Sequence, residues 1–128
     1  MISYNISATL SDDFSARTSN DVYVQIIGTA GSTEELMCPN GTFLNTYLGG
    51  TVNCAVNSDV DIGNYTCVTW RLDGIDGLEI AEFTTSIDGV EQETIVPADG
   101  WIDDTFGNNG QIATWCKTGT IGTIMNNC

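Results

Sequence analysis

The chain has 128 residues, seventeen acidic and three basic side chains, a net charge of −14 and no histidine. This length suits one domain with a core of its own. So acidic a surface repels the phosphates of nucleic acids, and it repels anionic lipid headgroups unless a divalent cation bridges the two. The absence of histidine removes the commonest general base and the usual zinc ligand. Composition therefore argues against nucleic-acid binding and against catalysis.

Alternation of apolar and polar residues predicts strands along most of the chain. Residues 3–10 alternate without a fault, and residues 22–27 (VYVQII) give the clearest strand, because β-branched and aromatic side chains fit a pleated, buried surface. Further strands are expected at 33–38, 51–56, 67–72, 78–86 and 90–96. Apolar residues do not recur at helical spacing over three turns. The pattern predicts an antiparallel β-sandwich of about eight strands, with 22–27 at its centre and Trp70 and Trp101 in its core.

The character of the sequence changes after residue 104. A flexible break at 107–110 (GNNG) precedes a stretch rich in glycine and threonine that contains Cys116 and Cys128. We therefore expect residues 1–104 to form the sandwich and residues 105–128 to form a C-terminal tail.

The five cysteines are widely spaced and never form a C-x-x-C pair, which argues against a zinc site and a redox motif. Such spacing in an acidic β chain indicates disulfides made in an oxidising compartment. We expect two disulfides, and we name Cys116–Cys128 as one of them because their short separation makes loop closure cheap. The odd cysteine is then free, bound to another chain, or paired with a residue outside this sequence.

Three N-x-S/T sequons, at Asn5, Asn40 and Asn64, agree with an extracellular or cell-surface location, although a chain rich in asparagine and threonine also produces sequons by chance. Neither a signal peptide nor an apolar run long enough to span a bilayer is present. If the protein is secreted, Met1 belongs to a processed or partial chain.

Several short motifs, taken in order, resemble the PLAT domain, a β-sandwich module of polycystins, lipoxygenases, animal lipases and bacterial alpha-toxin. The resemblance is carried by residues 9–24, Gly28, Gly31, 47–50 (YLGG), 61–63 (DIG) and 101–103 (WID). It extends over residues 3–104. It implies an eight-stranded sandwich without catalytic activity, which binds membranes or partner proteins, often with calcium held by three loops at one end.

The resemblance also implies candidate calcium ligands. Asp12 matches the aspartate of the family's T-G-D loop, and Asp76 falls near the ligand of the late acidic loop, while Asn40 and Asn45 lie near the middle ligand position. Two departures count against calcium. Ser19 stands where the family's A-G-T-D turn has its aspartate, and Arg17 replaces the glycine of that turn.

Calcium requires six to eight oxygen ligands. Asp12, Asp13, Asp73 and Asp76 could supply several of them if their loops meet, as the resemblance implies. The alternatives are that these acidic turns serve only solubility, or that Arg17 acts as the cation of the site.

The loop aromatics Phe14, Phe43 and Tyr47 could enter a lipid interface or anchor a protein partner, or they could cover the edges of the sandwich. The carboxylate pairs Glu79 with Glu82 and Asp103 with Asp104 carry no signal of a substrate cleft. The first hypothesis is thus a non-catalytic extracellular module that attaches a larger protein to a membrane surface or a partner, assisted by calcium. The second is a structural subunit of an extracellular filament or matrix, assembled through its tail and cysteines.

Overall fold

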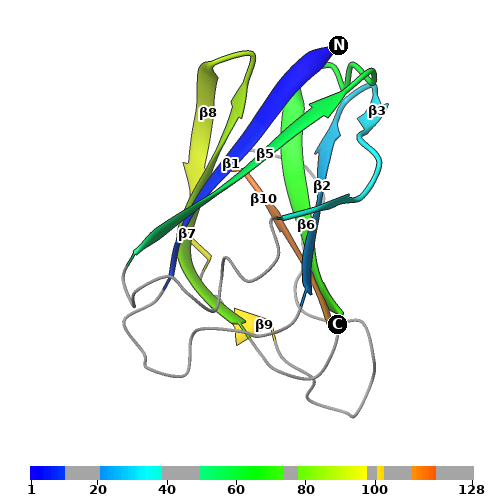
Figure 1. The fold of residues 1–128 in the computed structure, drawn as a ribbon. Coiled ribbons are helices and arrows are strands. Elements are labelled where there is room, and N and C mark those ends of the chain that lie inside the picture. The colour runs from blue at the N-terminus through cyan, green and yellow to red at the C-terminus, as the bar shows by residue number, and fades with distance from the viewer. Residues whose placement is uncertain (11–20, 39–49, 74–77, 98–100, 103–110, 118–128) are drawn as a thin grey trace.

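The computed structural model describes residues 1–10, 21–38, 50–73, 78–97, 101–102 and 111–117, which form two antiparallel sheets packed face to face (Figure 1). One sheet runs in the order β5 (Thr51–Ser58), β1 (Ile2–Leu10), β7 (Leu78–Ile87), β8 (Val90–Ile95), with β9 (Trp101–Ile102) also on β7. The other runs in the order β10 (Gln111–Cys116), β6 (Tyr65–Asp73), β2 (Asp21–Gly28), β3 (Gly31–Ser32), with β4 (Leu36–Met37) also on β2. The predicted antiparallel sandwich is confirmed, and the described residues contain no helix that could cross a membrane.

The inward residues of the alternating strands make the core between the sheets. Every second residue of β1 from Tyr4 to Leu10 is buried, and β2 buries Val22, Val24 and Ile26 in the same way. Trp70 of β6 is fully buried, as predicted, and its ring meets Phe83 of β7 edge to face at 5.5 Å. For Trp101 only the backbone is described.

The predicted strand 33–38 is shorter in the structure, where only Leu36–Met37 is a strand. The reason is the side chain of Thr33, which is buried. Its hydroxyl accepts a hydrogen bond from the Ile26 amide at 3.1 Å and donates one to the Glu34 carbonyl at 2.9 Å. Since the hydroxyl takes the place of a backbone carbonyl, the ladder along β2 is interrupted at this point.

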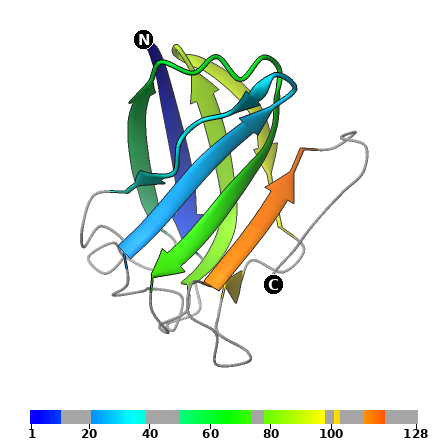
Figure 2. The same cartoon turned by 90° about the vertical axis from the view of Figure 1, so that its right-hand side faces the viewer.

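Strand β10 lies within the segment that the sequence assigned to a tail. It pairs with β6 over its whole length, from Gln111 opposite Leu72 to Cys116 opposite Cys67 (Figure 2). Ala113 is buried in the core, and the ring of Trp115 lies 6.0 Å from that of Phe83. Residues 111–116 are therefore an edge strand of the sandwich.

Two disulfides are present, Cys38–Cys54 and Cys67–Cys116, as many as predicted. The predicted pair Cys116–Cys128 is wrong, because the register of β10 places Cys116 directly opposite Cys67, with their Cα atoms 4.0 Å apart. Cys128 lies outside the described residues. Cys38–Cys54 joins the end of the β4 segment to β5, and thus connects the two sheets.

Candidate functional site

The three segments expected to carry the calcium site all join strand ends at the same end of the sandwich (Figure 1). Their described anchors are Leu10 and Asp21, Cys38 and Gly50, and Asp73 and Leu78. The Leu10 amide donates to the Gly50 carbonyl at 3.0 Å, and the Cys38 amide donates to the Val22 carbonyl at 2.8 Å. Strand pairing therefore brings the bases of the three segments to one end, which we call the loop end.

Two aspartates stand directly opposite each other at the loop end. Asp21 opens β2, and the register pairs it with Asp73, the last residue of β6. For Asp73 only the backbone is described. Asp73 was predicted from the sequence, whereas Asp21 was missed because only the strand register reveals their pairing.

The other predicted ligands, Asp12, Asp13 and Asp76, lie outside the described residues, as do Arg17, Ser19 and the neighbouring asparagines Asn40 and Asn45. The loop aromatics Phe14, Phe43 and Tyr47 do too. In the part of the chain that is described, no group of three or more acidic or cysteine side chains could hold a metal ion. Calcium ligation at the loop end stays a prediction.

A charged cluster lies on the outer face of the second sheet. Arg71 of β6 makes two parallel hydrogen bonds to the Glu35 carboxylate, at 2.8 and 2.9 Å, and its guanidinium lies 4.3 Å from the centre of the Tyr23 ring. The hydrogen bond from Arg71 lowers the pKa of Glu35, and burial opposes this effect. Because both charges are satisfied within the cluster, its evident role is structural.

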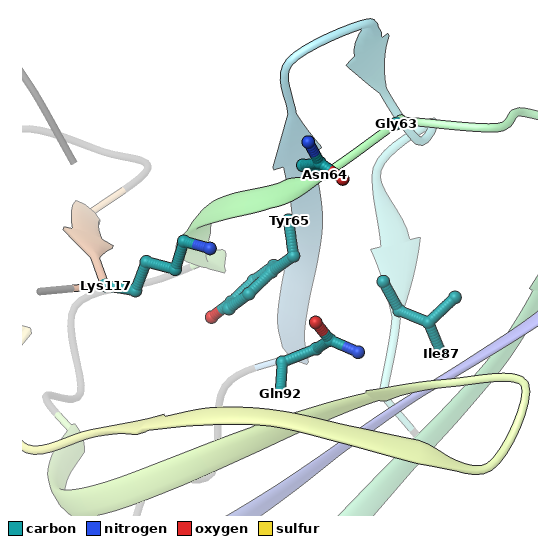
Figure 3. Close-up of a pocket in the computed structure, with 6 residues that line it drawn as sticks. All are labelled: Gly63, Asn64, Tyr65, Ile87, Gln92 and Lys117. Atoms are coloured by element: carbon teal, nitrogen blue, oxygen red, sulfur yellow. The ribbon is translucent and has the colours of Figure 1, made fainter. Parts of the chain in front are cut away.

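Figure 3 shows the residues that line a pocket of about 370 Å³. The pocket lies at the end opposite the loop end, where β6 begins and β7 ends. Its lining comes from the start of β6, the end of β7, β8 and the residue that follows β10: Gly63, Asn64, Tyr65, Ile87, Gln92 and Lys117. Its volume is at the small end of the range of ligand sites. Four separate segments form it, so no local sequence motif could have revealed it.

Tyr65 forms the inner wall of the pocket and is almost completely buried. Burial raises the pKa of its hydroxyl to about 12, while the nearby Thr85 hydroxyl acts to lower it and the charge of Glu93 acts to raise it further. The hydroxyls of Tyr65 and Thr85 lie close together, but neither makes a well-formed hydrogen bond to a described group. Tyr65 is therefore neutral at physiological pH.

Gly63, the last residue of the turn 61–63 (DIG) that contributed to the PLAT resemblance, lines this pocket. The Asp61 carboxylate accepts a hydrogen bond from the Gly63 amide at 3.0 Å, and Gly63 has a φ of 77°, which favours glycine. The Asn64 amide donates to the Thr29 hydroxyl at 3.1 Å. Gly28 allows this close approach, because a Cβ there would lie 2.6 Å from the Asn64 carbonyl oxygen.

Two of the three sequons fall on described residues. Asn5 is half-buried on β1, opposite the small residues Ala55 and Ser86 of the neighbouring strands. Asn64 is exposed at the pocket, and the hydroxyl of Thr66 donates to the Ile27 carbonyl at 3.1 Å. Asn40 lies outside the described residues. Glycosylation at these positions stays a prediction.

The arrangement of strands is that of a PLAT-like, C2-like β-sandwich, and solved structures confirm this fold. A lipoxygenase variant superposes with a TM-score of 0.70 at 17% identity and covers 91% of this chain. Coral 8R-lipoxygenase, in which calcium activates through a C2-like domain, gives a TM-score of 0.65 at 16% identity and covers 86%. Clostridium perfringens alpha-toxin gives 0.64 at 17% identity and also covers 86%. No family model and no curated protein matches the sequence.

This chain spans only a small part of each of these proteins: 17% of the lipoxygenase variant, 16% of coral 8R-lipoxygenase and 30% of the toxin. The similarity is thus to one sandwich within a much larger chain. At these identities it establishes the fold alone.

Proposed function

We propose that this chain is a non-catalytic extracellular attachment module, which holds a membrane surface or a partner protein at its loop end with the help of calcium. The observation that carries the proposal is the gathering of three loop bases at one end, where Asp21 stands opposite Asp73. The two disulfides support an extracellular location. The calcium activation of coral 8R-lipoxygenase through its C2-like domain supports the role of the ion.

Calcium would change the electrostatics of attachment. A protein with a net charge of −14 is repelled by an anionic membrane. Calcium held by Asp12, Asp13, Asp73 and Asp76 would offset two of the negative charges of the loop end and could also coordinate lipid phosphate or partner carboxylates. The aromatics Phe14, Phe43 and Tyr47 are the candidates for contact with the bound surface.

The test measures thermal unfolding and sedimentation with anionic vesicles, in millimolar calcium and in sodium chloride of matched ionic strength. Calcium should raise the melting temperature more than sodium does, since specific binding adds RT ln(1 + [L]/Kd) to the free energy of unfolding. It should also cause co-sedimentation. Asp76→Asn should abolish both effects. Asp59→Asn removes the same charge from an exposed residue at the opposite end and should change neither.

Arg17 provides the critical comparison. If Arg17 acts as the cation of the site, calcium should do no more than sodium for the wild-type protein, and Arg17→Gly should create a calcium response. Equal effects of calcium and sodium on both proteins would refute a cation site at the loop end. A calcium-stabilised protein that ignores vesicles would favour a protein partner over a membrane.

A second candidate function is a structural subunit of an extracellular filament or matrix. The observation in its favour is that the two disulfides use four of the five cysteines, so Cys128 has no partner left within this sequence. Covalent dimers or larger species that reductant dissolves, and that Cys128→Ser abolishes, would support assembly. A monomer indifferent to reductant would favour the attachment module.

A further inference from the structure

We propose that the pocket opposite the loop end is a binding site for a small organic monocarboxylate. The carboxylate would pair with the Lys117 ammonium, and the apolar part of the ligand would lie against Ile87 and the ring of Tyr65. Because this site is at the other end of the sandwich, it does not depend on the function proposed for the loop end.

Lys117 differs from the other described cation in its partners. The chain has only three basic residues against seventeen acidic ones. Of the two that are described, Arg71 is satisfied by the Glu35 carboxylate and the ring of Tyr23. Lys117, in contrast, makes no ion pair with a described residue, and Figure 3 shows its ammonium directed toward Tyr65 across the pocket. An ammonium with no carboxylate partner in the part of the chain that is described is notable in so acidic a protein.

The backbone holds Lys117 in place. Its amide donates to the Thr66 carbonyl at 2.9 Å, and the preceding residue, Cys116, is bonded to Cys67 of β6. Two successive residues are thus fixed to β6, which itself forms the wall of the pocket. A charge on a fixed backbone loses less entropy when it binds a ligand than one on a free chain.

The charges around the pocket favour a ligand with one negative charge. Apart from Lys117 the lining is uncharged, since Tyr65 keeps its proton and the side chains of Asn64 and Gln92 are amides. The Gln92 amide is oriented by a hydrogen bond to the Val90 carbonyl at 3.0 Å. Glu93, exposed on the same strand, adds a negative charge near Tyr65. One cation compensates one negative charge, so the second charge of a dianion such as phosphate would remain uncompensated in the presence of Glu93.

The volume of the pocket limits the size of the ligand. A volume of about 370 Å³ is more than twice the ~150 Å³ cavity that encloses a benzene molecule. The pocket therefore suits a ligand of amino-acid or monosaccharide size. Ile87 and the ring of Tyr65 can contact its apolar face, while Asn64 and Gln92 can exchange hydrogen bonds with an amide or hydroxyl group.

The test compares two probes of nearly the same shape, N-acetylleucine and its neutral amide, in an NMR titration of the intact protein. N-acetylleucine should cause saturable shifts of the backbone amides of Gly63, Asn64 and Lys117, and the neutral amide should bind at least about tenfold more weakly. Lys117→Gln should weaken binding of the acid by at least about tenfold, and Lys117→Arg should retain it. Arg71→Gln removes the same charge from the outer face of the second sheet and should leave the affinity unchanged.

Three results would overturn the proposal. One is the absence of saturable shifts at the pocket amides in millimolar N-acetylleucine. Another is equal affinity for the acid and the amide. The third is a Lys117→Gln variant that binds as tightly as the wild-type protein, which would show that any binding does not involve this ammonium.

Discussion

Removal of β10 should destabilise the protein strongly, although its sequence resembles a dispensable tail. The strand supplies a full ladder with β6, the buried Ala113, the contact of Trp115 with Phe83, and the disulfide to Cys67. This disulfide closes a loop of 49 residues, for which the chain-entropy relation gives about 4 kcal/mol. The aromatic contact adds about 1 kcal/mol. Small domains have only about 5–15 kcal/mol of stability in total.

Denaturant unfolding of two truncated proteins measures this contribution. One ends at residue 104, and the other ends at Lys117, which keeps every contact just named. The shorter protein should be less stable by at least about 4 kcal/mol, or unfolded in the absence of denaturant. Free energies of unfolding that agree within about 1 kcal/mol would refute this prediction and would support the view that these residues are a dispensable tail.

Two further predictions concern residues near the pocket. The pKa of Tyr65 is about 12 in the folded protein, against 10.0 for an ordinary tyrosine, so the neutral hydroxyl stabilises the fold fully below pH 10. As the pH rises to 12, the free energy of unfolding should fall by about 2–3 kcal/mol for this reason. In Tyr65→Phe, urea unfolding between pH 9 and 12 should show a decrease in the free energy of unfolding that is smaller by that amount, and an equal decrease in both proteins would contradict the assignment. Gly28→Ala should lower the free energy of unfolding by about 1–3 kcal/mol, because the new Cβ would collide with the backbone carbonyl oxygens of Ile62 and Asn64. A melting temperature equal to that of the wild type would contradict the close approach.

The strands with regular alternation could be predicted from sequence, since their residues report directly which face is buried. Residues 3–10 and 22–27 match β1 and β2 closely. Strand β10 was missed because a single six-residue strand in a context of glycine and threonine gives little periodic signal. Residues 111–116 form a strand because they pair with β6, and no local sequence pattern encodes that pairing.

The error in disulfide pairing has a physical cause of the same kind. Closing a loop over the sequence separation of 12 between Cys116 and Cys128 costs less entropy than closing one over the separation of 49 between Cys67 and Cys116, but the difference is only about 1.3 kcal/mol. Strand register easily outweighs so small a preference. The pocket also escaped prediction, because Lys117, Gln92 and Asn64 are brought together only by the fold.

The placement of the two disulfides gives the sandwich two unequal sides. Cys38–Cys54 ties one sheet to the other on the side of β4 and β5, whereas Cys67–Cys116 lies within a single sheet, so no described disulfide crosses between the layers on the side of β8 and β10. We therefore expect the two layers to separate more readily on the side of β8 and β10 than on the side of Cys38–Cys54. Amide hydrogen exchange should then be fastest along β8 and β10, the side on which the pocket opens. A ligand bound between Gln92 and Lys117 would contact both sheets and slow that exchange.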